Sequence, residues 1–254
     1  MAIDVPTTFE TPLEKLKWIM RALRDKNNGC PWDIEQSYET IALHTIEEAY
    51  EVVDAIENGA KDDLKEELGD LLFQIIFYTQ LTDEESLFGF DDVTNQVADK
   101  MISRHPHVFG DVTLDNANDV YDVWDAQKSK EKTSNSALDN ITGALPALLR
   151  AQKIQKQAAK IGFEWQNTSQ ALGKFNEELQ EFQEAETTED KEEEFGDMLF
   201  ALVNYGRMNN IHTEEALRKA NEKFINRFQK MEKATDLKDL SLDQMLSAWQ
   251  EVKA

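Results

Sequence analysis

Basic residues are scarce in this chain of 254 residues, which has 27 lysines and arginines against 50 aspartates and glutamates. The formal net charge is −23. A nucleic-acid duplex is bound through its phosphates, and that contact needs a basic protein surface. The charge balance therefore argues against a nucleic-acid polymer as partner. A free nucleotide remains compatible with it, because a bound metal ion can reverse the local sign of charge.

Cysteine and long apolar runs are also nearly absent. The single cysteine, Cys30, cannot form a disulfide within the chain, which suits a reducing compartment. The N-terminal segment has neither a basic start nor an apolar core, so it does not resemble a signal peptide. No stretch reaches the roughly 18–20 consecutive apolar residues of a membrane-spanning helix. We therefore expect a cytoplasmic protein with no membrane partner.

Glycine and proline, which interrupt helices, number only 10 and 5. Strong helix formers such as alanine, leucine, glutamate and lysine are abundant, whereas strict alternation of apolar and polar residues is rare. The chain is 41% hydrophobic, which is enough for one large core or two small ones. These features predict an all-α fold.

The sequence contains an internal repeat of acidic motifs. In each half, a tryptophan-containing segment ("CPWD", then "FEWQ") precedes a helix with the pattern E-E-x-x-E. After a short break, E-x-x-D opens a strongly apolar helix. The acids of the first half are Glu47, Glu48, Glu51, Glu67 and Asp70, and those of the second half are Glu177, Glu178, Glu181, Glu194 and Asp197. The repeat predicts two similar helical domains.

A polar segment without periodicity, "SKEKTSNSALDN", separates the two copies. We place the first domain at 1–128, a linker at 129–140 and the second domain at 141–254. Each domain also has a later helix with the pattern K-x-x-x-R, which recurs as Lys100 with Arg104 and as Lys223 with Arg227.

The acidic helix of the second half has two possible interpretations. At about 100° per residue, Glu177, Glu181 and Glu184 share a narrow sector of the helix, opposite apolar residues. Taken alone, this is an amphipathic helix with a solvated acidic face. However, Asp197 leads into the apolar run "MLFALVNYG", and a carboxylate beside a buried helix costs free energy unless it is paired or metal-bound.

Five carboxylates that converge from two helices suit a hard cation that prefers oxygen ligands, Mg²⁺ or Mn²⁺. A di-iron carboxylate bundle would need Glu-x-x-His pairs, and the sequence has none. The four histidines do not form a plausible zinc set. The nearby cations Lys174, Lys223 and Arg227 are either intramolecular counter-charges or phosphate contacts, for which arginine and lysine are both suited.

The whole pattern resembles the MazG family of nucleoside triphosphate pyrophosphohydrolases, and its two-domain bacterial members in particular. The likeness covers nearly the whole chain and includes "CPWD", "GDLLFQ" and "RHPHVFG" in the first half. It implies an all-α pyrophosphatase fold, a homodimer, and Mg²⁺-dependent hydrolysis of NTPs and dNTPs to monophosphate and pyrophosphate. The implied role is broad house-cleaning of the nucleotide pool, with Mn²⁺ as a possible substitute for Mg²⁺.

The resemblance also implies roles for individual residues. The metal ligands would be Glu177, Glu178, Glu181, Glu194 and Asp197, and the nucleotide contacts would be Lys174, Lys223, Arg227, Trp249 and Lys253. Glu178 and Glu181 would be catalytic, with Glu181 accepting a proton from the attacking water. The first-half acids Glu47, Glu48, Glu51, Glu67 and Asp70 would form a vestigial site.

Two differences between the halves favour the second as the catalytic one. The first half has His44 where the second has Lys174, and Phe77 where the second has Asn204. The first half has therefore lost a phosphate contact and a polar neighbour. Two alternatives to a broad hydrolase remain open: a narrow dNTP or dUTP hydrolase, and a non-enzymatic acidic scaffold that dimerises.

Overall fold

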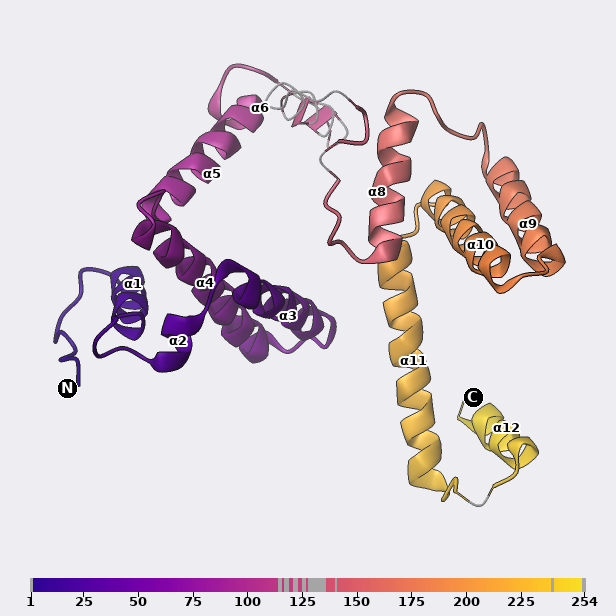
Figure 1. The fold of residues 1–254 in the computed structure, drawn as a ribbon. Helices are drawn as coiled ribbons and strands as arrows, with labels where there is room; N and C mark the ends of the chain where they lie inside the picture. Colours follow the sequence, from indigo (N-terminus) through magenta and orange to yellow (C-terminus); the bar gives the residue numbers. More distant parts are fainter. Residues whose placement is uncertain are drawn as a thin grey trace. The chain divides into compact units, whose positions relative to one another are not determined.

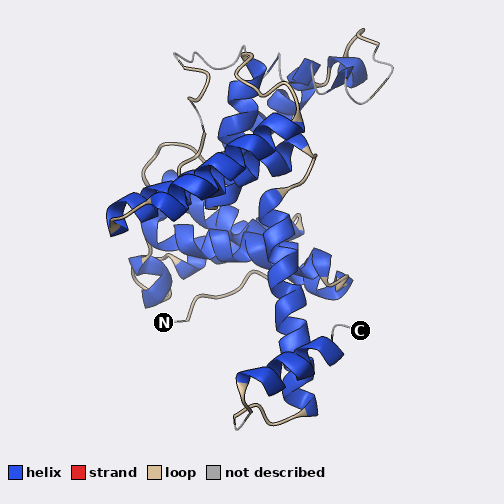
Figure 2. Ribbon diagram, turned by 90° about the vertical axis from the view of Figure 1, so that its right-hand side faces the viewer, coloured by secondary structure: helices blue, strands red, loops and turns tan. Residues whose placement is uncertain are grey.

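The computed structural model describes residues 2–113, 116, 119–120, 123–124, 127, 136–139, 141–238 and 240–252. These residues form helices and loops and contain no strand, which confirms the predicted all-α class (Figure 1, Figure 2). None of the helices in these ranges is long and apolar enough to cross a membrane.

The chain divides into two compact units. The first unit comprises Met1–Lys132 and the second comprises Thr133–Ala254. Of the linker predicted at 129–140, the structure describes only residues 136–139. The division of roles between the two predicted domains stays a prediction.

The first unit is built around a hairpin of two long helices, α3 and α4. Its helices are α1 (Pro12–Leu23), α2 (Pro31–Glu35), α3 (Tyr38–Glu57), α4 (Lys61–Glu84), α5 (Phe90–Arg104) and α6 (Pro106–Phe109). Helices α3 and α4 pack against each other, and α1 packs on α4 (Figure 1). The core between these three helices consists of Met20, Ile41, Ile76, Phe77 and Leu81.

Local sequence signals set the ends of the α3–α4 hairpin. Ser37 caps α3 in a capping box with Thr40, which satisfies backbone N–H groups that would otherwise lack partners. Three residues separate α3 from α4, and Gly59 among them has a φ of 67°. Glycine adopts this left-handed conformation without steric cost, so the chain can reverse within a short turn.

The second unit contains another hairpin, formed by α9 and α10. Its helices are α8 (Ala147–Lys160), α9 (Thr168–Glu184), α10 (Thr188–Met208), α11 (Thr213–Ala234) and α12 (Leu242–Glu251). Asn167 caps α9 and Thr187 caps α10 through their side-chain oxygens. Helix α8 packs on α10, where Gln155 donates a hydrogen bond of 2.8 Å to the carbonyl of Phe200.

Helix α11 leaves this hairpin and reaches α12. It contacts α8, α10 and α12. Figure 1 shows α12 beside the C-terminal half of α11, where the rings of Phe224 and Trp249 lie 5.0 Å apart.

Candidate metal centres

Three carboxylates of the second unit meet between α9 and α10. Glu178 of α9 lies with Glu194 and Asp197 of α10, and one oxygen from each falls within 4.8 Å of the others. The three-residue turn between the helices sets them side by side and antiparallel, so the N-terminal part of α10 faces the C-terminal part of α9. Only 7% of Glu178 is exposed, and a charge this buried needs a partner. We call these three residues the second cluster.

Lys174 supplies positive charge to this cluster from one turn earlier on α9. Its Nζ lies 2.6 Å from an oxygen of Glu178 and 2.7 Å from an oxygen of Glu177. The hydrogen bonds to Glu177 and Glu178 raise the pKa of Lys174 well above its usual range. In the metal-free chain, Lys174 therefore acts as an intramolecular counter-charge.

Two further glutamates next to the ion pair are harder to ionise than usual. Burial raises the pKa of Glu181, and its hydrogen bond with Glu178 adds to the effect. Burial also raises the pKa of Glu194, followed by repulsion from Glu178 and Asp197. Lys174 opposes both shifts. The site therefore carries more negative charge than its own lysine neutralises.

An open acidic hollow of about 490 Å³ adjoins the second cluster at the turn between α9 and α10. Its lining consists of Glu181, Glu184, Ala185, Glu186, Thr187, Asp190 and Glu194. Because five of these seven residues are acidic, the hollow gives a cation a favourable approach to the cluster.

The first unit has a matching cluster between α3 and α4. Glu48, Glu67 and Asp70 each place a carboxylate oxygen within 4.8 Å of the others, and we call them the first cluster. Burial raises the pKa of Glu48, with repulsion from Asp70 as the next cause. The pKa of Glu67 is raised in the same way, by burial and then by repulsion from neighbouring acids.

In the first cluster, the partner of Glu48 is a neutral amide, whereas the partner of Glu178 in the second cluster is a lysine. Gln74 Nε2 donates to Glu48 Oε1 over 3.4 Å, and Gln74 is only 9% exposed. Its Oε1 is buried and has no hydrogen-bond partner within the described residues. His44, at the position matching Lys174, lies 3.6 Å from Glu47 and makes no such pair with Glu48.

Both clusters have the chemistry of a site for Mg²⁺ or Mn²⁺. All their donors are carboxylate oxygens, which these hard cations prefer. Ligand distances of about 2.1 Å place the oxygens around Mg²⁺ about 3–4 Å apart. The present separations of up to 4.8 Å need only a small contraction, which a bound cation favours by removing the repulsion between the acids.

Not every sequence-predicted site residue joins the acids. Lys223 and Arg227 lie on α11, and neither forms an ion pair with a carboxylate within the described residues. Trp249 of α12 packs on Phe224. Lys253 lies outside the described residues. Within the described part of the second unit, Lys174 is thus the predicted nucleotide contact that pairs with the acids.

Neither Gln74 nor the partner of Asn204 was predicted from the sequence. Gln74 follows Asp70 by four residues, so helical spacing alone would have placed it on the same face. Asn204 accepts hydrogen bonds from Arg207 at 3.2 Å and 2.7 Å, and Arg207 also pairs with Glu164 at 2.5 Å. The side-chain oxygen of Asn204 is therefore the acceptor for the guanidinium of Arg207.

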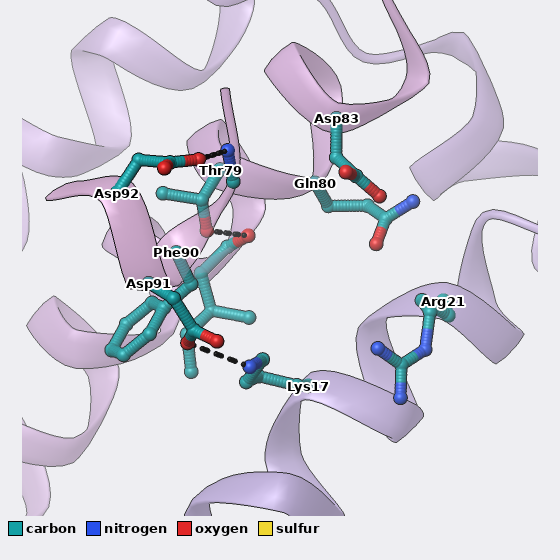
Figure 3. A pocket seen from close by; sticks show the side chains of 10 residues that line it. Lys17, Arg21, Thr79, Gln80, Asp83, Phe90, Asp91 and Asp92 are labelled. Atoms are coloured by element: carbon teal, nitrogen blue, oxygen red, sulfur yellow. Dashed lines mark hydrogen bonds and ion pairs between the residues drawn. The ribbon is translucent and has the colours of Figure 1, made fainter. Parts of the chain in front are cut away.

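A separate cavity of about 280 Å³ lies in the first unit between α1, α4 and the start of α5 (Figure 3). Lys17 Nζ lies 3.1 Å from Asp91 Oδ1, and the backbone N–H of Gly89 donates to Asp92 over 2.9 Å. Thr79 donates to the carbonyl of Ile76 over 3.0 Å. The cavity borders the C-terminal part of α4, whereas the first cluster lies in its N-terminal part, so the two are distinct.

Comparison with known proteins identifies the family of this chain. Residues 36–109 match the family model of the MazG nucleotide pyrophosphohydrolase domain, and this range includes the first cluster. The chain is 45% identical to the nucleoside triphosphate pyrophosphohydrolase of Escherichia coli K12, over 95% of this chain and 97% of that protein.

Other relatives are similar over nearly the same length of this chain. A nucleoside triphosphate pyrophosphohydrolase/pyrophosphatase MazG of Thermotoga maritima is 39% identical, over 94% of this chain and 95% of the relative. The uncharacterized protein YabN of Bacillus subtilis is 43% identical over 92% of this chain, which corresponds to 50% of YabN. This chain therefore belongs to the MazG family of nucleotide pyrophosphohydrolases.

Proposed function

We propose that the protein hydrolyses nucleoside triphosphates to monophosphates and pyrophosphate with divalent metal ions, and that it accepts a broad range of bases and both sugars. The observation that carries the proposal is the second cluster, a carboxylate triad with a lysine beside it, in a chain that belongs to a pyrophosphohydrolase family. The names of the Escherichia coli and Thermotoga maritima relatives support the same reaction.

The acids of α9 and α10 would hold Mg²⁺ in this reaction. Glu178, Glu194 and Asp197 supply the nearest set of oxygens, with Glu177 and Glu181 beside them. Bound magnesium would neutralise the triphosphate and acidify a water molecule for attack. Attack at the α-phosphorus releases pyrophosphate, and the side chains then have to position the nucleotide and move one proton.

Glu181 is suited to accept the proton of the attacking water. It lies beside Glu178 and lines the hollow that adjoins the second cluster, and a general base must lie next to the reacting groups. Lys174 is suited to hold a phosphate oxygen, because it already lies beside the acids and 35% of its side chain is exposed. We assign Lys223, Arg227, Trp249 and Lys253 to further nucleotide contacts on the basis of family resemblance.

We also assign catalysis to the second unit. Lys174 beside the second cluster supports this assignment, since the first cluster has no lysine at the matching position. The family match over 36–109 covers the first unit, and both units have a carboxylate triad, so the assignment rests on the neighbours of the acids. The vestigial status of the first cluster follows from the same argument.

A homodimer is the proposed assembly, supported by exposed apolar side chains on the second unit. Monomeric proteins seldom leave many large apolar residues in water on neighbouring helices. Those exposed on α9, α10 and α11 are Leu172, Phe195, Leu199, Phe200, Leu202, Leu217, Phe224, Ile225 and Phe228. Light scattering coupled to gel filtration would test the dimer, and a monomer at all concentrations would contradict it.

The test of function is a product assay with the four NTPs and the four dNTPs, each with and without Mg²⁺. Monophosphate plus pyrophosphate in the presence of Mg²⁺ is the expected result, with similar rates across the panel. Turnover of one nucleotide alone would favour a narrow hydrolase. Diphosphate plus orthophosphate would move the attack to the γ-phosphorus and contradict the proposal, and no product would favour the acidic scaffold.

A further inference from the structure

Glu178 of the second cluster and Glu48 of the first cluster have different hydrogen-bond partners. Glu178 pairs with the ammonium of Lys174 at 2.6 Å. Glu48 receives only the neutral amide of Gln74, at 3.4 Å. The same three-acid geometry is therefore combined with a charged partner in the second unit and with an uncharged one in the first.

Lys174 competes with a metal ion for the carboxylate of Glu178. A divalent cation that binds Glu178 must either displace the ammonium or tolerate its repulsion at short range. In the first cluster a cation meets no such competitor, because the Gln74 amide bears no charge. With Lys174 paired to Glu178, the second cluster is thus the poorer site for a metal ion alone, although Glu178 is more buried than Glu48.

The position of Lys174 also allows it to leave. Its side chain is 35% exposed and lies on the surface of α9, so it can rotate away without opening the core. A triphosphate is a stronger attractant for an ammonium than a single carboxylate, since it presents several charged oxygens.

We propose that Lys174 gates the second cluster: it occupies Glu178 while no nucleotide is present and releases this carboxylate to metal when phosphate draws it away. This inference rests on the proposed function, because the ligand that draws Lys174 away is the nucleotide substrate. Metal and nucleotide then bind the second unit together, whereas the first unit binds metal alone. Metal that is not accompanied by substrate is disfavoured at the catalytic centre.

The test measures binding of Mn²⁺ alone to the full-length protein, by the electron paramagnetic resonance of free Mn²⁺. Glu67→Gln combined with Asp70→Asn leaves the second cluster as the remaining triad. In this background, Lys174→Gln is expected to tighten Mn²⁺ binding by about fivefold to tenfold, the worth of one partly exposed ion pair. Lys174→Arg keeps the charge and is expected to bind Mn²⁺ as the parent does.

Lys191→Gln is the matched control for net charge. Lys191 lies on α10 close to Glu194 in sequence, is exposed, and has no ion pair within the described residues. Its removal lowers the positive charge of the hairpin by the same amount, yet it is expected to change Mn²⁺ affinity by less than about twofold. An equal gain from Lys191→Gln and Lys174→Gln would overturn the gate in favour of a general charge effect.

The reciprocal exchange tests the first cluster. Glu194→Gln combined with Asp197→Asn leaves Glu48, Glu67 and Asp70 as the remaining triad. Adding His44→Lys places a lysine one turn before Glu48, and we expect Mn²⁺ binding to weaken by about fivefold. Unchanged binding in a variant that melts like its parent would overturn the proposal.

Addition of a nucleotide separates failure of the gate from failure of the proposed function. With a triphosphate whose α–β bridge is a methylene group, Mn²⁺ affinity of the second cluster should rise, and it should rise less in the Lys174→Gln variant. A rise of the same size in both proteins would overturn the gate alone. No Mn²⁺ binding to the second cluster, with or without nucleotide, would overturn the proposed function itself.

Discussion

The α3–α4 hairpin and the α9–α10 hairpin carry the same two acidic motifs, E-E-x-x-E and E-x-x-D, but they surround them differently. In the first, Glu48 lies under the Gln74 amide, and Phe77 fills the core two turns beyond Asp70. In the second, Glu178 pairs with Lys174, and Asn204 at the matching position binds Arg207. The same acidic motif therefore has different surroundings in the two hairpins, because neighbouring side chains set the charge and polarity next to its carboxylates.

Substitutions in the two clusters should differ most in their effect on kcat. Glu178→Ala removes a buried ligand of the second cluster and should lower kcat by at least about 10²-fold, since even outer-shell changes at metal sites cost 10–100-fold. Glu48→Ala should leave kcat within about twofold, because the first cluster is assigned no catalytic role. Steady-state release of pyrophosphate measures both, and equal losses would end the proposed division of labour.

Stability should separate the two hairpins next. Phe77 is 1% exposed, and the Arg24 guanidinium carbon lies 5.4 Å from its ring centroid. Phe77→Ala should reduce the free energy of unfolding by about 3–5 kcal/mol, from lost burial and the cavity left behind. Asn204→Ala at the matching position should cost only about 1–3 kcal/mol, because Arg207 keeps its bond to Glu164.

Denaturant titration followed by circular dichroism would measure both variants. A cost for Asn204→Ala as large as that for Phe77→Ala would show that the polar contact of the second hairpin contributes as much as the apolar core of the first.

Metal binding should stabilise the folded protein, because the clusters exist only in the native state. Mg²⁺ at 100 times its dissociation constant should add about 2.7 kcal/mol per site to the free energy of unfolding. The Tm of the chelator-treated protein should therefore rise when Mg²⁺ is restored. The rise should be smaller in Glu67→Gln/Asp70→Asn, and an unchanged rise would mean that the first cluster binds no metal.

The smallest effect is a pH dependence of the metal-free protein. The pKa values of Glu181 and Glu194 are raised in the folded state, so their contribution to stability is greatest at low pH and is lost as pH rises through these values. The Tm of the wild type, relative to that of Glu181→Gln/Glu194→Gln, should therefore increase as the pH falls from about 7 to 5.

Saturating Mg²⁺ supplies the control for this measurement. Bound metal keeps both carboxylates ionised, so the relative gain at low pH should disappear or reverse. A relative Tm that falls with falling pH in the metal-free protein would contradict the raised pKa values.

Much of the candidate site was predictable because helical periodicity is regular. The spacing of Glu194 and Asp197 places both on one side of a helix, and the short break that begins at Ala185 lets the next helix return along α9. These rules led to the second cluster without coordinates. Helical spacing also places Gln74 on the same face as Asp70, but nothing in the sequence showed that its amide would be buried against Glu48.

The sequence did not show whether each basic residue acts as a counter-charge or as a phosphate contact. Lys174 can reach Glu177, Glu178 or solvent from its place on α9, and the packing of α10 determines which arrangement is favourable. For Lys223 and Arg227, helical spacing predicts a shared face, but neither forms an ion pair with the acids within the described residues. Long side chains have many rotamers, so their partners depend on which other elements lie within reach.

Residue type, spacing and similarity along the chain were enough to predict the all-α class, the acids of both hairpins and the family. The tertiary structure decided which acids form each triad, that Lys174 holds Glu178, and that Gln74 holds Glu48. The physical reason is that charge and hydrogen-bond energies depend on distances between helices, and those distances are fixed only when the hairpins pack.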